Sequence, residues 1–453
     1  MRKLLAISLA LLPAFVQSAY ADQNLIDIYQ IALNRDPALA SAISSNLAAQ
    51  EKQRQGLALL LPTITANSNA NHSDAEVGYL GGRSPFSPGQ QSFETFSYGV
   101  NLNQPVFRMQ SFLQYAQSKI QVTQADKQLI LSQQDLMTRT AQAYFDVLLS
   151  QDKIDLINAQ KAAINRQLEQ AKANFDAGTA TITDVNDAQA KYDLTLAQEI
   201  AALNDFEVKK RAMQSITGEV PQKLATVSQD LKITLVEPTD MEKWVEIAEQ
   251  NNLELIIQQQ NLELATKEVS KQQAGHLPTM DLVASYNDTR ASGSFNGFGT
   301  DIQSSNFGVQ VQIPLYQGGA TSSKIREAVA NKTKAEDDVE TARRKADLDT
   351  RQAYLNLTGG VAQVKAYEQA LSSSQSQLDS TNLAYEVGVR TSVDVLNAQQ
   401  QYFSAKRDLL QSRYVYLLSI VKLKQAAGVL NELDLNDINS RLVRAAVESS
   451  PIN

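Results

Sequence analysis

Residues 307–319 have the sequence Phe-Gly-Val-Gln-Val-Gln-Ile-Pro-Leu-Tyr-Gln-Gly-Gly, in which apolar side chains alternate with small or amide ones up to the proline. Residues 96–103 alternate in the same way, with Phe, Tyr, Val and Leu at even positions and Ser, Gly and Asn at odd ones. A period of two with one apolar face is typical of a barrel strand between lipid and water. It fits equally well a half-buried hairpin on a soluble protein, so alternation alone leaves both interpretations open.

The chain contains two copies of one unit. Leu61-Pro62-Thr63 recurs 216 residues later as Leu277-Pro278-Thr279, and farther along the offset is 210. A difference in loop length between the two units accounts for the change. In each unit a helical pattern ends at the Leu-Pro, alternating segments follow, and a second proline precedes a further helical pattern. We therefore expect an internal two-fold repeat with strands within residues 63–105 and 279–315, four per chain, of which 63–69 and 279–286 carry the weaker pattern.

A very long helix is expected after the second proline of each unit. Residues 111–176 and 321–386 contain no proline, and apolar side chains recur with heptad spacing over residues 357–385. At 1.5 Å per residue, each helix would be about 100 Å long, and the heptads favour coiled-coil packing. Gly178 and Gly388 would end these helices at equivalent places, and a shorter helix would then return.

The first residues and the charge restrict the compartment and the partners. Residues 1–21 combine a basic start, an apolar stretch and a small-x-small site, which indicates a cleaved signal peptide. Its removal takes away Arg2 and Lys3, so Lys+Arg falls from 41 to 39 against 49 Asp+Glu and the net charge becomes −10. An acidic chain without basic clusters argues against nucleic acid as a partner. The chain has no Cys, which excludes disulfides and thiol chemistry.

The repeat divides the remaining residues into four segments. We expect a first unit at 22–218, a linking segment at 219–238, a second unit at 239–428 and a tail at 429–453. The linking segment and the tail are expected to pack against the outside of the helices.

Closure of a membrane sheet has a consequence for assembly. An open sheet edge within a bilayer leaves unpaired N–H and C=O groups, each costing several kcal/mol. Four strands cannot close a barrel, because the smallest bacterial barrels have about eight. If the strands lie in a membrane, two chains would share a barrel of about eight strands, or three chains one of about twelve. The residues do not decide between these numbers.

Several stretches resemble the TolC family of outer-membrane channels: Pro314-Leu315-Tyr316-Gln317-Gly318-Gly319, the paired Leu-Pro-Thr turns, Gly178 and Gly388, and Thr391-Ser392-Val393-Asp394-Val395-Leu396. The resemblance covers essentially the whole chain after residue 21. It implies an α+β membrane protein, a homotrimer whose 12-stranded β-barrel is continued by a long α-helical coiled-coil tunnel into the periplasm.

The same resemblance implies a function and partners. The chain would be a passive exit duct in the cell outer membrane, gated at its periplasmic end, for tripartite drug efflux and type I protein secretion. Its partners would be outer-membrane lipid, a periplasmic adaptor (membrane fusion) protein, and an inner-membrane efflux pump or ABC exporter. The alternative is a secreted periplasmic coiled-coil protein with a structural or adaptor role and no membrane strands.

The residues give no indication of an enzyme. The two histidines, His72 and His276, are far apart in the sequence, and no nucleophile elbow, Walker loop or zinc-protease motif occurs. We therefore expect no catalytic residues, no metal and no cofactor.

The ends of the long helices carry the candidate functional residues. Thr181 and Thr391 each precede an aspartate by three residues, Asp184 and Asp394, so both pairs predict a capping box. The two units differ nearby, because Tyr385 and Arg390 stand where the 210 offset puts Phe175 and Ala180. A tyrosine and an arginine near a threonine and an aspartate could form charge-assisted hydrogen bonds.

The resemblance gives these residues roles. It implies that Tyr385 and Arg390 hold the periplasmic entrance closed through Thr183 and Asp184, within and between subunits. It also implies a pore ring of acidic side chains at Asp394. The second ring position is Asn397 here, and whether its repeat mate Asp187 faces the pore is left open.

The turns at the helix ends have two interpretations. Gly178 and Gly388 suit the left-handed position that ends a helix. By resemblance, Gly178, Thr179, Gly388 and Val389 would also contact the adaptor.

Overall fold

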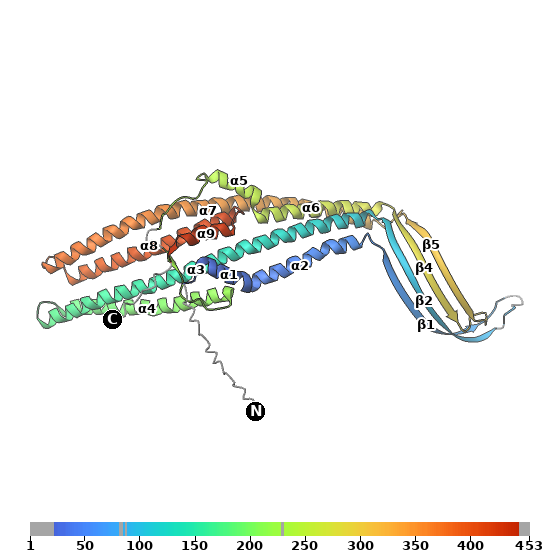
Figure 1. Cartoon of the computed structure of the whole chain (residues 1–453), viewed down its shortest axis with the longest axis horizontal. Coiled ribbons are helices and arrows are strands. Elements are labelled where there is room, and N and C mark those ends of the chain that lie inside the picture. Colours follow the sequence, from blue (N-terminus) through green and yellow to red (C-terminus); the bar gives the residue numbers. More distant parts are fainter. Residues whose placement is uncertain (1–21, 81–84, 87, 228–230, 444–453) are drawn as a thin grey trace, which may run out of the picture.

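The computed structural model describes residues 22–80, 85–86, 88–227 and 231–443. The expected signal peptide at 1–21 and the end of the expected tail, residues 444–453, lie outside these residues. The chain is elongated, with long helices running side by side and a small sheet extending from one end of them (Figure 1).

The sheet has four antiparallel strands in the order β1-β2-β4-β5. Its strands are β1 (Thr63–Val77), β2 (Gly89–Phe107), β4 (Thr279–Ala291) and β5 (Thr300–Gln312). The expectation of four strands, two from each repeat, is confirmed. The pairing of β2 with β4 joins the two repeats into one sheet. β1 and β4 extend well beyond the expected residues 63–69 and 279–286. Their additional residues are largely polar and lack the alternation of apolar and polar side chains, so the sequence pattern did not predict them as strand.

The alternation in the sequence becomes two faces of the sheet. Leu102 pairs with Ala284, which pairs with Phe307, and directly paired residues point to the same side. Phe307 and Val311 on this side are 77% and 56% exposed. Large apolar side chains therefore cover an open face of the isolated chain, while Gln310 and Gln312 belong to the opposite face.

Helices make up most of the remainder of the described chain, and they occur as equivalent pairs with one member in each repeat. The long helices are α3 (Met109–Asp176) and α7 (Ala320–Glu386), which begin and end within two residues of the expected bounds. Each is followed by a returning helix, and each strand pair is preceded by a helix; these are α4 (Ile182–Thr217), α8 (Ser392–Ala426), α2 (Pro37–Ala58) and α6 (Leu253–Gln273). Within the described residues, no helix is both long and apolar enough to cross a membrane.

The helical pattern before each Leu-Pro is interrupted, which the sequence pattern did not indicate. α1 (Leu25–Arg35) precedes α2, and α5 (Met241–Asn251) precedes α6. Asp36 separates the first pair: its side chain accepts a hydrogen bond from the Leu39 N–H, and Pro37 occupies the first helical position. Asn252 has the same capping role in the second repeat. The remaining elements are the short helices α9 (Glu432–Ser440) and η1 (Ala274–His276) and the short strands β3 (Thr226–Val227) and β6 (Leu442–Val443).

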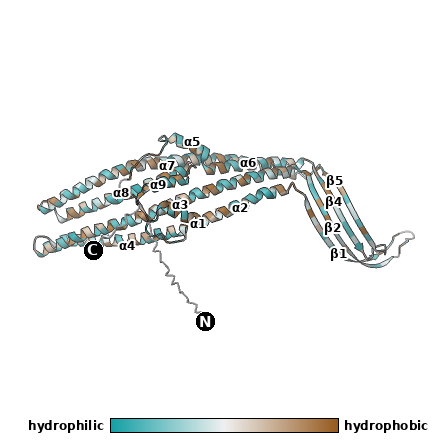
Figure 2. Cartoon of the chain, in the orientation of Figure 1, coloured by the Kyte–Doolittle hydropathy of each residue, from teal (hydrophilic) through white to brown (hydrophobic). Residues whose placement is uncertain are grey.

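The main core lies where the short elements pack against the middle of the long helices. Two tyrosines buried there hold the linking segment through its backbone: the Tyr144 hydroxyl donates to the Ala225 carbonyl (2.7 Å) and the Tyr416 hydroxyl to the Thr234 carbonyl (2.7 Å). A smaller buried cluster lies near the helix ends and consists of Ile164, Leu168, Ala171, Ala188 and Leu396. Away from these clusters polar and apolar residues are intermixed along the helices (Figure 2).

Candidate functional site

The two ends of the helical layer farthest from the sheet are built from the same backbone motif. Gly178 has φ +76°, and its N–H donates to the Phe175 carbonyl (2.9 Å). The Thr179 N–H donates to the Asn174 main-chain carbonyl (2.8 Å). This is the Schellman arrangement, in which a glycine in the left-handed region closes the helix. Gly388, with φ +79°, ends α7 through the equivalent bonds.

Both returning helices begin with the predicted capping box. Thr181 Oγ1 accepts from the Asp184 N–H (3.3 Å), and the Asp184 carboxylate accepts from the Thr181 N–H (2.9 Å). Thr391 and Asp394 repeat this pair at the same distances. In each case the hydrogen bonds from the threonine N–H and hydroxyl lower the pKa of the aspartate, because they stabilise the ionised carboxylate.

Tyr385 and Arg390 lie in this region with partners from their own chain. The Tyr385 hydroxyl accepts from Asn174 Nδ2 (3.3 Å), which joins α7 to α3. Arg390 Nη1 lies 3.7 Å from Asp394 Oδ1, and the Arg390 side chain is 58% exposed. A hollow of about 440 Å³ brings Tyr385, Arg390 and Asp184 together with Thr179 and Gly388 in its lining.

The other predicted residues lie near the starts of α4 and α8. Thr183 is exposed on the first turn of α4, and Asn397 is exposed on α8, while Asp187 is half-buried. A link from Tyr385 or Arg390 to Thr183 and Asp184, and a pore-facing position for Asp394, stay predictions.

A further bond at the same end was not found from the sequence. Gln167 Nε2 on α3 donates to Ser392 Oγ on α8 (3.1 Å), and both side chains are 6% exposed. With the Asn174–Tyr385 bond, it ties the first helical pair to the second next to the small apolar cluster. Comparison of the two units gives two signals, because the 210 offset pairs Ser392 with Ile182 and Asn174 with Ala384. Gln167 carries no such signal, because its equivalent is Gln377.

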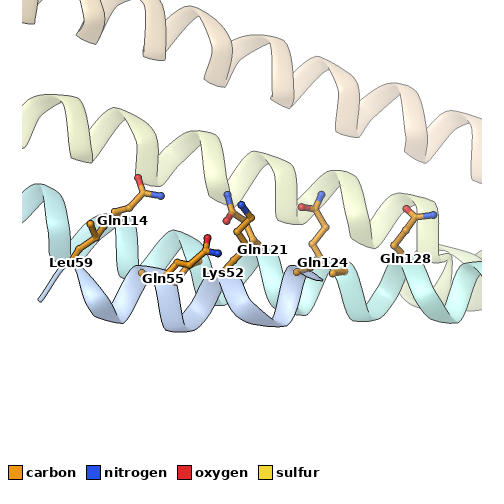
Figure 3. A pocket seen from close by; sticks show the side chains of 11 residues that line it. Lys52, Gln55, Leu59, Gln114, Gln121, Gln124 and Gln128 are labelled. Atoms are coloured by element: carbon orange, nitrogen blue, oxygen red, sulfur yellow. The ribbon is translucent and has the colours of Figure 1, made fainter. Parts of the chain in front are cut away.

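Another hollow, of about 820 Å³, lies between α2 and α3 near the sheet (Figure 3). Its labelled lining is mostly amide: Gln55, Gln114, Gln121, Gln124 and Gln128, with Lys52 and Leu59. Neutral amides can form hydrogen bonds with polar solutes but do not act as acids or bases at neutral pH. Among the described residues, no group of three His, Cys, Asp or Glu could hold a metal ion.

A family model described as "Outer membrane efflux protein" matches residues 28–219 and again residues 244–429. The chain belongs to the outer membrane efflux protein family. The double match coincides with the two repeats, so the resemblance stated from the sequence is confirmed. Membership makes the chain a transport protein of the outer membrane rather than an enzyme, and it decides against the alternative of a secreted coiled-coil protein.

Individual relatives agree along the full length. The outer membrane protein TolC of Vibrio cholerae is 34% identical over 446 residues, covering 98% of this chain and 99% of the relative. The alkaline protease secretion protein AprF of Pseudomonas aeruginosa is 29% identical and covers 93% and 87% of the two chains. The crystal structure of the outer membrane protein VceC from Vibrio cholerae superposes with a TM-score of 0.75 at 19% identity, covering 89% and 96%. This last likeness concerns the fold.

Proposed function

We propose that three copies of this efflux-family chain form a passive channel-tunnel through the outer membrane, closed at its periplasmic end until a partner opens it. The observation that carries the proposal is the sheet, in which β1 and β5 stand at the two edges of the described chain. A sheet edge cannot face lipid unpaired, so β5 of one copy would pair with β1 of the next. Three four-stranded sheets then close a barrel of about twelve strands, which is within the bacterial range.

The helices support the same assembly. In the described chain α3 contacts α4 and α8, and α8 contacts α7, which leaves α4 and α7 at the two edges of the layer. Both edges expose large apolar side chains: Ile200 on α4 is 63% exposed and Leu348 on α7 is 62% exposed. Exposed apolar rows of this kind mark interaction surfaces, and the neighbouring copy would cover them.

Mass and conductance test the assembly. Purified protein in detergent should have the mass of three chains and should give stepwise conductance when added to a planar lipid bilayer. Because the chain has no Cys, one cysteine placed on β1 and one on β5 would report strand pairing between copies without competing thiols. A monomer that leaves the bilayer impermeable would contradict the proposal.

The gate is proposed at the helix ends. Tyr385 and Arg390 would bind Thr183 and Asp184 of the same or the neighbouring copy, and three Asp394 carboxylates would narrow the entrance. The proposal is supported by the hollow that already gathers Tyr385, Arg390 and Asp184. Arg390 supports it as well, because its long 3.7 Å contact with Asp394 leaves guanidinium donors available for a second partner.

The cargo and partners are proposed from the relatives and the exposed turns. AprF is named for protease secretion and the family for efflux, so we propose both drug efflux and type I protein export. A periplasmic adaptor, joined to an inner-membrane pump or ABC exporter, would grip Gly178, Thr179, Gly388 and Val389. Val389 is 76% exposed and offers the adaptor an apolar contact at the tip. Cross-linking from a cysteine at Val389 to co-expressed adaptor tests this contact.

A further inference from the structure

The connection between β4 and β5 folds back onto the sheet. It is a loop of eight residues, 292–299, with the sequence Ser-Gly-Ser-Phe-Asn-Gly-Phe-Gly. Pairing with β2 continues one residue beyond the end of β4, because the Ser292 N–H donates to the Glu94 carbonyl (2.8 Å). The next residue, Gly293, lies beside Phe93, and a Cβ there would come within 2.8 Å of the Phe93 Cβ. The loop therefore leaves the sheet in close contact with Phe93.

Phe93 identifies the side of the sheet on which the loop begins. Side chains alternate along β2, so Phe93 shares a face with Asn101. Asn101 pairs with Ser285, which pairs with Asn306, and this polar face is opposite to the face of Phe307. The proposed function places the polar face toward the lumen of the barrel. The loop therefore begins on the lumen side of β2.

Phe295 then lies across the lumen face instead of pointing away from it. Its ring packs edge-on against the Phe93 ring, with 5.3 Å between the centroids and 82° between the planes. Its carbonyl accepts from the Tyr79 hydroxyl (3.3 Å), so the loop reaches past β2 to the residues that follow β1. A Cβ at Gly297 would lie 4.0 Å from Oε1 of Gln91, which is on the same face of β2 as Phe93. These contacts hold the loop over the inner side of the sheet end.

The loop exposes large apolar side chains in this position. Phe295 is 55% exposed and Phe298 is 68% exposed. A closed barrel of about twelve strands, spaced about 4.8 Å apart and tilted by about 40°, has a backbone radius of about 12 Å. A layer packed on the inner face of a sheet lies about 10 Å from the sheet backbone. Three such loops would therefore extend over most of the distance to the barrel axis, and their phenylalanines would meet near it.

We propose that the 292–299 loops of three copies form a second constriction at the outer exit of the barrel, in which Phe295 determines what passes. An apolar constriction is poorly wetted, so it slows hydrated ions and small polar solutes. Apolar or polypeptide cargo displaces the rings, because a ring contact and a 3.3 Å hydrogen bond hold Phe295 in place. The inference rests on the proposed trimeric barrel, and it adds a filter at the end of the channel opposite to the helix tips.

Labelling of a lumen cysteine from outside intact cells tests the constriction. The chain has no Cys, so Asn306→Cys places a single thiol on the polar face of β5, between the loop and the helices. The reagent is a maleimide attached to a bulky polyethylene glycol, which cannot cross the membrane by another route. We expect Phe295→Ser to accelerate labelling about fivefold, the factor by which loss of one aromatic contact shifts the balance between closed and open loops. Labelling after unfolding should be complete in every variant.

The control is Phe96→Ser, which removes an equal ring three residues from Phe93 on the opposite face of β2 and should keep the parent rate. Equal rates with and without Phe295, or an equal acceleration in both variants, would overturn the inference. So would an absence of labelling in every folded variant, because Asn306 would then not face a lumen open to the exit. Mass and conductance are measured on the same proteins: a conducting trimer whose labelling does not depend on Phe295 removes this inference alone, whereas a non-conducting monomer removes the proposed function.

Discussion

The Arg390 guanidinium lies 3.7 Å from the Asp394 carboxylate four residues later, at the start of α8. The same carboxylate caps α8 through Thr391. One aspartate thus serves both a helix end and an arginine, and removing the arginine should leave the cap intact.

We predict that Arg390→Ser combined with Tyr385→Phe raises single-channel conductance in planar bilayers. The double variant loses the guanidinium and the hydroxyl proposed to hold the entrance closed, but it leaves the helix caps and the apolar cluster unchanged. The oligomer should stay about as resistant to heat and detergent as the wild type. The matched control is Arg407→Ser with Tyr402→Phe, two positions on α8 farther from the tip. This control should leave conductance unchanged. An unaltered conductance in the first variant would make Tyr385 and Arg390 ordinary surface residues.

We predict that the entrance favours cations because of Asp394. Three carboxylates at a constriction attract cations, as acidic rings do in cation channels. Asp394→Asn should nearly abolish block by multivalent cations from the periplasmic side, and Asn397→Asp should strengthen it. Reversal potentials in a salt gradient measure the selectivity of all three proteins. Identical selectivity would leave Asp394 as a helix cap whose loss costs about 1 kcal/mol or less.

We predict that the two faces of β5 tolerate charge differently. Phe307 lies near the middle of β5 on the apolar face, and Asn306 belongs to the opposite face. Arg at a lipid-facing site near the middle of a bilayer costs about 2–4 kcal/mol, but little on the lumen side. Phe307→Arg should therefore lower the free energy of unfolding in lipid by this amount, and Asn306→Arg should have little effect. Equal tolerance would refute the assignment of the faces.

Two glycines on α7 and at its end give a matched pair of substitutions. A Cβ at Gly359 or at Gly388 would meet no atom of the described residues within 4 Å beyond its chain neighbours and the backbone of its own helix, yet only the second has a positive φ, +79°. Gly388→Ala should destabilise the tip by about 1–2 kcal/mol, the cost of the left-handed conformation. Gly359→Ala, inside the helix, should stabilise it by about 0.5–1 kcal/mol. Thermal unfolding followed by circular dichroism compares them, and an equal sign for both would contradict the backbone argument.

We predict that the helix tips lose stability in acid. The pKa of Asp184 and that of Asp394 are lowered in the folded chain by hydrogen bonds from the threonine N–H and hydroxyl. Their contribution is therefore fully present above the unfolded pKa of about 3.9, and it is lost as the pH falls through the lowered folded values. The double variant Asp184→Asn and Asp394→Asn should show a flatter pH dependence of stability below about pH 4. A slope identical to that of the wild type would show that other carboxylates dominate.

Much of the fold follows from local signals in the sequence. Proline and glycine positions place the ends of α3 and α7 within two residues, because a missing N–H or a required positive φ acts locally. The break at Asp36 carried the same kind of signal, an N-cap followed by Pro37, but it was hidden in a continuous helical pattern. The polar ends of β1 and β4 have no alternation of apolar and polar side chains that would predict a strand. They are extended because their backbones pair with a neighbouring strand.

The site was predictable to the extent that it repeats. Comparison of the two halves singled out Tyr385 and Arg390, and spacing predicted both capping boxes. The same comparison distinguishes Asn174 from Ala384, but it does not indicate a bond to Tyr385. Gln167 is matched by Gln377 and is not distinguished at all. The bonds of Asn174 and Gln167 depend on how two helical pairs pack, which no local pattern encodes.

The matching Schellman turns at Gly178 and Gly388 bear on how this chain could have changed since its two halves were duplicated. Each tip is shaped by main-chain hydrogen bonds, and a single glycine is all that these bonds require of the turn. The neighbouring side chains were therefore free to diverge, and one half now carries Phe175 and Ala180 while the other carries Tyr385 and Arg390. A gate could be gained, altered or lost by point mutation in one half without redesign of the scaffold that presents it.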